Sequence, residues 1–248
     1  MREVKYLGFI VNSHGRRIDP DRIQNLRDMK GPSTVKGVQK LGGSINFLRQ
    51  FIPDYSRMAE PITRLLSSKS KEIVLGSEQK ETWETILESL EKRLTISHIQ
   101  EEGELILRTD ASTFGIGGVL LQKQEDREVL INLFSRKFTK TEQRWTTIEQ
   151  EAFGIVYGVI SNSYYLLGKR FTVETDHRNL TFIYKSEVPK LLRWRLKLAQ
   201  FEFDIHHIPG KVNLTADVLS RISQVQESSF VKSIQHSDDM NEITEHEP

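Results

Sequence analysis

Acidic residues stand at the ends of several elements that the sequence predicts in its second half. Asp110 closes one expected strand and Asp176 closes another. Glu149 and Glu151 lie early in an expected long helix, and Asp217 opens the last expected helix. In open α/β sheets, ligands gather outside the carboxyl ends of the strands, so we expect these side chains to converge at one edge of a sheet.

Converging carboxylates repel one another, and such a cluster is tolerated when protons or divalent cations neutralise it. Magnesium fits because it takes oxygen ligands and retains several waters. Two such ions about 4 Å apart would clamp a scissile phosphate. The alternative for each acid alone is a capping role, for Asp217 in particular. Helical geometry does not choose between Glu149 and Glu151, because they flank the apolar stripe of their helix on opposite sides.

The elements that must position these acids follow an α/β pattern. Three short strand-like runs separated by turns come first, and a helix, a strand, a helix, a strand and a final helix follow. The strands are expected at 104–109, 115–122, 129–135, 171–175 and 201–208, and the later helices at 188–200 and 216–222. The long helix carries its apolar stripe from Ile148 to Val159, and Thr139 with Glu142 fits a capping box before it. The pattern predicts a mixed five-stranded sheet flanked by helices.

The first third of the sequence is mainly helical in pattern. Residues 6–11 are apolar enough for one short buried strand, and Asp19-Pro20 then begins a helix. A second helix is expected from Ser33 or Thr34 to Ile52, where its apolar spacing ends. Gly42-Gly43 inside this helix predicts a bend or the close approach of another backbone. These elements predict a helical subdomain before the α/β region.

The composition excludes several classes of protein. The 248 residues include no cysteine, which excludes disulfides, a cysteine nucleophile and thiolate metal sites. No run approaches the roughly 18 apolar residues of a membrane span, and the first residues lack a signal-peptide pattern. Residues 1–70 hold thirteen Lys and Arg against six Asp and Glu, whereas residues 222–248 hold one Lys against six acids. The basic third favours a polyanionic partner, with a solvated face as the alternative, and the acidic tail is expected to be disordered.

The expected helix at 188–200 is basic and amphipathic. Its Lys and Arg residues are interpreted either as phosphate contacts or as a solvated helix face. Trp194 is expected to lie in the core beside the leucines of this helix, with stacking on nucleic acid as the alternative.

Several strings resemble the ribonuclease H domain of LTR-retrotransposon reverse transcriptases, particularly of the gypsy type. In chain order they are LRTDAS and GIGGVLLQ (107–122), FSRK (134–137), TIEQE (147–151), ETDHRNLTF (174–182) and IPGKVNLTADVLSR (208–221). YLGFIV (6–11) and LGGSINFLRQFIP (41–53) are similar to the thumb segment that follows the polymerase palm in this family. The resemblance implies a thumb-like segment over 1–75, a connecting helix over 76–103, a ribonuclease H-like domain over 104–222 and a disordered acidic tail over 223–248.

The resemblance also implies the site and the reaction. The catalytic and metal-binding quartet that it implies is Asp110, Glu151, Asp176 and Asp217. Glu151 is chosen over Glu149 because the family's glutamate directly precedes the apolar helix pattern. The implied reaction is hydrolysis of the RNA strand of an RNA–DNA hybrid by two Mg²⁺ ions, with Mn²⁺ as a substitute. Implied substrate contacts are Ser112, Thr113, Arg178 and Asn213, with turn or capping roles as the alternative. His207 and His177 are auxiliary candidates, with packing roles as the alternative.

The expected partners are the hybrid duplex and the rest of a reverse transcriptase polyprotein, and a homodimer stays open. We expect no membrane association and an intracellular location, in the cytoplasm or a virus-like particle, with the nucleus left open. The palm signature Tyr-x-Asp-Asp is absent, so we expect no polymerase activity from this chain alone. The alternative function is a catalytically silent transposon-derived module that binds nucleic acid or protein. A different nuclease or a transposase of the same fold is the third interpretation.

Overall fold

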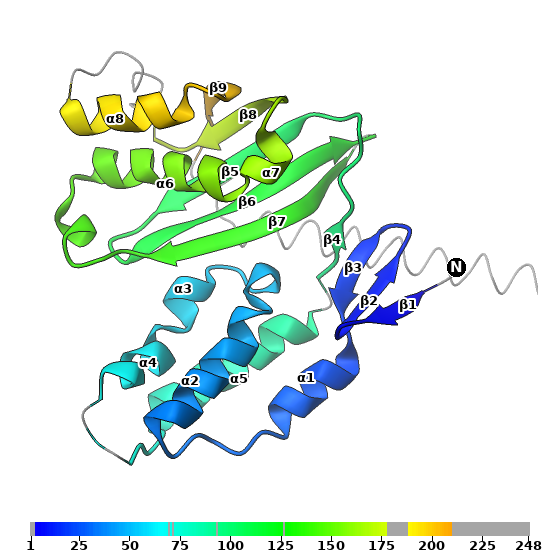
Figure 1. The fold of residues 1–248 in the computed structure, drawn as a ribbon, viewed down its shortest axis with the longest axis vertical. Helices are drawn as coiled ribbons and strands as arrows, with labels where there is room; N and C mark the ends of the chain where they lie inside the picture. Colours follow the sequence, from blue (N-terminus) through cyan, green and yellow to red (C-terminus); the bar gives the residue numbers. More distant parts are fainter. Residues whose placement is uncertain are drawn as a thin grey trace, which may run out of the picture.

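The computed structural model describes residues 3–68, 70, 72–92, 94–125, 127–177 and 188–209. Within these ranges the chain forms two β-sheets, with helices packed against both (Figure 1). Among the helices of these ranges, none has the length and apolar character needed to cross a bilayer. The expected final helix at 216–222 and the expected acidic tail lie outside the described residues.

A small four-stranded antiparallel sheet stands at the N-terminus. Its strands, in spatial order, are β1 (Val4–Tyr6), β2 (Phe9–Asn12), β3 (Gly15–Ile18) and β4 (Ile96–Ser97). The single strand predicted over residues 6–11 is wrong, because a hairpin turn at Leu7 and Gly8 interrupts it. Both turn residues have positive φ, 50° and 80°, which is the geometry that tight hairpins favour. The apolar side chains on both sides of Gly8 concealed this turn.

The N-terminal helices build a compact group beside this sheet. They are α1 (Pro20–Arg27), α2 (Val35–Asn46), the 3-10 helix η1 (Arg49–Phe51), α3 (Tyr55–Met58), α4 (Glu60–Thr63), the 3-10 helix η2 (Arg64–Ser67) and α5 (Ser77–Glu91). The side chain of Asp19 caps α1 by accepting from the Asp21 amide, which confirms the predicted start. Thr34 caps α2 by accepting from the Gly37 amide.

The predicted end of α2 is wrong, and of the two roles predicted for its glycine pair the close approach is not found. The helix ends at Asn46 and not at Ile52, because a 3-10 turn also places the following apolar residues inside, so their spacing did not mark the helix end. A Cβ atom added at Gly42 or Gly43 would meet nothing within 4 Å. The glycine pair therefore faces open space on the surface of α2 and does not serve a close approach within the described chain.

The second sheet is the predicted mixed five-stranded sheet. Its strands are β5 (Leu105–Ala111), β6 (Gly115–Gln124), β7 (Arg127–Lys137), β8 (Arg170–Thr175) and β9 (Glu202–His207), in the order β7-β6-β5-β8-β9. β5, β6 and β7 form the antiparallel meander, whereas β8 and β9 join β5 in parallel. The helical segments between β7 and β9 are η3 (Glu142–Arg144), α6 (Thr147–Ser161), α7 (Ser163–Leu166) and α8 (Pro189–Leu198).

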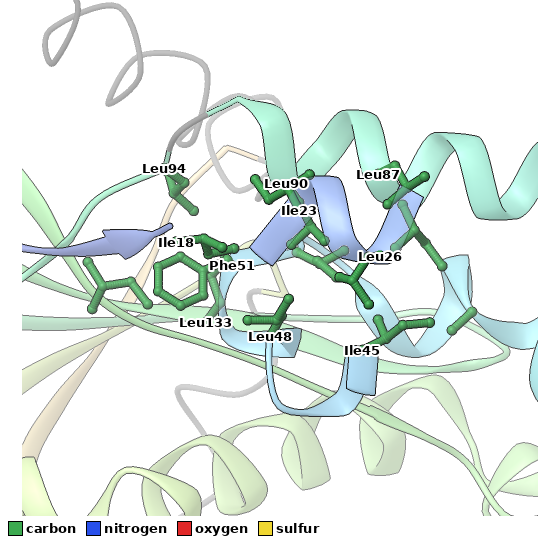
Figure 2. Close-up of a cluster of buried hydrophobic side chains, with 14 of the residues drawn as sticks. Ile18, Ile23, Leu26, Ile45, Leu48, Phe51, Leu87, Leu90, Leu94 and Leu133 are labelled. Atoms are coloured by element: carbon green, nitrogen blue, oxygen red, sulfur yellow. The ribbon is translucent and has the colours of Figure 1, made fainter. Parts of the chain in front are cut away.

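Both faces of this sheet are covered. Alternate strand residues point to opposite faces, so Leu105 and Leu107 pack under α6 and α8, whereas Ile106 packs toward the N-terminal group. On that second face Leu133 of β7 joins Leu48 and Phe51 in one cluster (Figure 2). Figure 1 shows the sheet between these two layers, with α6 and α8 above it and the N-terminal helices below. The N-terminal group and the sheet thus share one hydrophobic core.

Candidate metal centre

Three of the predicted acids meet at the carboxyl ends of two parallel strands. Asp110 lies near the end of β5, and Asp176 directly follows β8. These strands are parallel neighbours, with Arg108 opposite Glu174, so their ends lie at the same edge. Glu151 comes from the first turns of α6, and one oxygen from each of the three carboxylates lies within 4.8 Å of the others. This spacing allows a single cation to contact all three.

Local capping chemistry separates Glu151 from Glu149. Thr146 is the N-cap of α6, and its Oγ1 accepts from the Glu149 amide, while Glu149 Oε2 accepts from the Thr146 amide at 2.9 Å. Glu149 Oε1 accepts from Lys190 Nζ at 2.7 Å. Both oxygens of Glu149 are therefore engaged, and Glu151 is the glutamate that reaches the aspartates. The capping box predicted for Thr139 and Glu142 does form, but it caps the 3-10 helix η3, which precedes α6.

The cluster is electrostatically unfavourable without a cation. Burial, and then the charges of Asp110 and Asp176, raise the pKa of Glu151 to about 8. Burial and the neighbouring charge of Asp176 likewise raise the pKa of Asp110. Glu151 is only 5% exposed, and its Oε2 atom has no hydrogen-bond partner within the described part of the chain. An all-oxygen donor set with an orphaned buried carboxylate oxygen fits a hard divalent cation such as Mg²⁺.

The other predicted site residues are placed as follows. Ser112 closes the turn between β5 and β6, because its amide donates to the Gly115 carbonyl at 2.8 Å and its Oγ accepts from the Phe114 amide at 3.3 Å. Thr113 is exposed in the same turn. Asp217, Arg178 and Asn213 lie outside the described residues. Substrate contacts by these side chains stay predictions.

The two histidines lie close to the end of β8. His177 follows Asp176 and donates its amide to Thr175 Oγ1 at 3.2 Å, and its buried Nδ1 has no partner among the residues that the structure describes. His207 ends β9 opposite Thr175 and is half-buried. Both histidines are thus at the edge where the acids meet, and their auxiliary roles stay predictions.

Trp194 and Lys190 show how α8 is fixed to α6. Trp194 is 8% exposed and packs in the core beneath α8, which confirms the core prediction. Lys190 Nζ lies 4.2 Å from the centroid of the Trp145 ring while it donates to Glu149. Arg193 and Lys197 of the same helix are exposed.

Sequence reasoning missed one acid near the cluster, Asp54, which precedes α3. Its Oδ1 atom lies 3.8 Å from the position that a Cβ atom on Gly117 would take, and Gly117 is the cross-strand partner of Asp110. The charge of Asp54 contributes to the raised pKa of Asp110. The sequence signal at Pro53-Asp54 indicates a turn only, so nothing local pointed to this long-range contact.

Comparison with known proteins identifies the class. Residues 100–201 match the family described as the RNase H-like domain found in reverse transcriptase. Structures of the foamy viral protease–reverse transcriptase have the same fold over most of the chain. The form called dRH, in complex with double-stranded DNA, matches with a TM-score of 0.73 at 22% identity, covering 83% of this chain and 38% of that one. The complex with RNA/DNA hybrid matches with a TM-score of 0.69 at 23% identity, covering 84% of this chain and 30% of that one.

Sequence relatives cover nearly the whole chain. The retrovirus-related Pol polyprotein from transposon opus of Drosophila melanogaster is 32% identical over 260 residues, which is 97% of this chain and 25% of that polyprotein. The one from transposon 297 of the same species is 32% identical over 239 residues, which is 95% of this chain and 22% of that polyprotein. The transposon Tf2-3 polyprotein of Schizosaccharomyces pombe is 30% identical over 254 residues, which is 96% of this chain and 19% of that polyprotein. The chain spans a quarter or less of the length of these relatives.

Residues 100–201 are therefore an RNase H-like domain, as the sheet order and the acidic cluster also indicate. The chain is similar over nearly its whole length to retrotransposon Pol polyproteins, which confirms the resemblance seen in the sequence.

Proposed function

We propose that this chain hydrolyses the RNA strand of RNA–DNA hybrids with two Mg²⁺ ions. The observation that carries the proposal is the meeting of Asp110, Glu151 and Asp176 within 4.8 Å, with the buried Oε2 of Glu151 left without a partner in the described structure. The family match supports a nuclease, and a protein of the same fold has been solved with RNA/DNA hybrid.

The roles of the acids follow from their burial. Glu151 lies on the buried side of the cluster, whereas Asp110 and Asp176 are half-buried and open toward solvent. Substrate phosphate is therefore expected to approach from the side of the two aspartates. When bound, the two cations would supply the charge that activates a water and stabilises the leaving oxygen. We propose that Asp217 completes the ligand set and that the products carry a 3′-hydroxyl and a 5′-phosphate.

Exposed lysine and arginine side chains would hold the duplex at the edge of the sheet where the acids meet. Lys190 is occupied by Glu149, so the helix α8 offers Arg193 and Lys197, which are exposed. The basic N-terminal group, proposed as a thumb-like unit, would add phosphate contacts along the duplex. Phosphate contacts by lysine and arginine make affinity fall with rising salt. Recognition by backbone shape and the 2′-hydroxyl predicts cleavage without base preference.

A cleavage assay tests the proposal. A uniformly labelled RNA–DNA hybrid is incubated with the whole chain and Mg²⁺, and single-stranded RNA serves as the substrate control. We expect cleavage of the hybrid only. Asp176→Asn and Glu151→Gln are each expected to reduce the rate at least about 100-fold, because the loss of a ligand exceeds the 10–100-fold cost of disturbing an outer partner.

Glu149→Gln is the matched control. Glutamine also completes a capping box, so this variant keeps α6 in place while it changes a glutamate two residues from Glu151. Glutamine has one acceptor oxygen and so gives up the charged bond from Lys190 when it caps α6, and we therefore expect a loss of rate that is much smaller than that of Glu151→Gln. Hybrid binding without turnover in Mg²⁺ or Mn²⁺ would overturn the proposal and favour the silent binding module.

A further inference from the structure

The segment that follows η1 is seated directly beside the metal centre. The amide and the Oγ of Ser56 both donate to Ser135 Oγ of β7, at 3.0 and 2.9 Å. Lys137 of the same strand donates to Glu60 Oε1 at 3.0 Å. These contacts connect the N-terminal group to the edge strand β7 over a separation of more than seventy residues, and they fix the position of the residue that precedes α3.

The register of the sheet places the segment that follows η1 close to the metal centre. Ser135 is paired with Gly117, and Gly117 is paired with Asp110, so the three residues form one row across β7, β6 and β5. Side chains of residues directly opposite each other point to the same face, with Cβ atoms about 5 Å apart. Asp54 Oδ1 lies above the middle of this row, 3.8 Å from the position of a Gly117 Cβ. Its carboxylate is thus within about 9 Å of the Asp110 Cβ, on the same face.

Asp54 is held in an unusual conformation and is weakly partnered. Its backbone is left-handed, with φ 46° and ψ 37°, a region that aspartate and asparagine tolerate better than other side chains. Its side chain is 50% exposed, and within the described chain the ion pair it makes is with Arg57 at 4.0 Å, which is the limit of such a contact. The carboxylate caps no helix amide. No strong interaction in the described structure therefore uses this negative charge.

We propose that Asp54 is a positioning residue of the metal centre, a carboxylate of the N-terminal group that accepts hydrogen bonds from water bound to a divalent cation held by Asp110, Glu151 and Asp176. This inference rests on the proposed metal-dependent function. Gly117 places no side chain between the two aspartates, and a Cβ there would already lie 3.8 Å from Asp54 Oδ1. The orphaned Oε2 of Glu151, which is almost fully buried, indicates independently that a cation belongs in this cluster.

Manganese binding by the whole chain tests the proposal without measuring activity. Free Mn²⁺ is followed by electron paramagnetic resonance during titration of the unchanged chain and of Asp54→Asn. Asparagine has nearly the same size and tolerates the left-handed backbone, so the variant removes the charge and keeps the fold. We expect the dissociation constant for Mn²⁺ to rise about tenfold, as is typical when an outer partner of a metal site is lost.

Two further variants serve as a control and as a test of the contacts that position Asp54. Asp28→Asn changes an aspartate of the N-terminal group whose side chain accepts from Gln24, and we expect no change in Mn²⁺ affinity. Ser135→Ala removes both hydrogen bonds from Ser56, and we expect a smaller loss of affinity with the fold retained in thermal unfolding. Equal Mn²⁺ affinity for Asp54→Asn and the unchanged chain would overturn the proposal, as would an unchanged chain that binds no Mn²⁺. Binding that depends on Glu151 and Asp54 without hybrid cleavage would overturn the proposed function alone.

Discussion

Lys190 Nζ on α8 lies 2.7 Å from Glu149 Oε1 at the start of α6, and both side chains are mostly buried, with 27% and 21% exposed. Glu149 also caps α6, and Glu151 lies two residues further along the same helix. The pair therefore fastens α8 to the turn that presents Glu151. A contact with no direct part in binding a cation thus helps to hold one of the ligands.

Replacement of Lys190 by methionine is expected to lower the free energy of unfolding by about 2 kcal/mol, because it removes a charged hydrogen bond in a largely buried setting. Lys190 lowers the pKa of Glu149, so this stability is present above the unfolded value near 4.5 and is lost as the pH falls through the lower folded value. Urea unfolding at neutral and acid pH measures both effects. Lys197→Met, on the exposed face of α8, is the control and should change stability by less than about 0.5 kcal/mol.

The metal-free protein should become less stable as the pH rises. Burial and the nearby aspartates raise the pKa of Glu151 to about 8, whereas the unfolded carboxyl titrates near 4.5. Between these values the folded protein holds a proton that the unfolded chain has released, so stability falls with increasing pH and then levels off. The slope is at most about 1.4 kcal/mol per pH unit for this group.

Urea unfolding in the presence of a chelator, from about pH 5 to about pH 9, checks this pH dependence. Glu151→Gln should remove most of the slope and should be more stable than the unchanged chain at the alkaline end. Glu149→Gln should keep the slope, because the pKa of Glu149 is lowered and not raised. A stability that rises over this range in the unchanged chain would contradict the ionisation assigned to Glu151.

Local patterns were sufficient to predict the five-stranded sheet and the placing of Asp110 and Asp176 at strand ends, because strand alternation and turn residues are local signals. Periodicity could not separate Glu149 from Glu151, since the decision lies in a capping box and in a lysine 41 residues away. The hairpin at Leu7 was hidden by the apolar side chains on both sides of Gly8. Asp54 was missed because its position depends on the packing of α3 against β7, which no short-range pattern encodes.

Alanine at Gly42 and Gly43 should stabilise the protein. Glycine inside a helix costs about 1 kcal/mol relative to alanine, and a Cβ atom at either position meets open space. We expect the double variant to gain about 1–2 kcal/mol in urea unfolding. A Gly37→Ala variant is the contrasting case, because its Cβ would lie 3.0 Å from Pro32. Loss of stability in the Gly42/Gly43 double variant would show that the surface is not open.

A fragment of residues 104–222 should be poorly soluble when separated from the N-terminal group. It would expose the apolar side chains that β5, β6 and β7 contribute to the shared core, namely Ile106, Val119, Leu121, Leu130 and Leu133. An apolar patch of this kind promotes association. We expect the fragment to bind a hydrophobic dye and to elute as aggregates in size-exclusion chromatography, whereas the whole chain should not. A monodisperse fragment with a cooperative unfolding transition would contradict this expectation.

The core shared by Phe51 and Leu133 also bears on how such chains exchange segments. A recombination event between two related elements with its breakpoint near residue 100 would bring together an N-terminal group from one parent and a sheet from the other. Side chains of unmatched size would then meet across the interface, at a cost of about 1–3 kcal/mol for each overpacked contact. Descendants of such crossovers should survive mainly when both parents carry compatible residues on the two sides of this interface. The N-terminal group and the sheet are therefore expected to be inherited together.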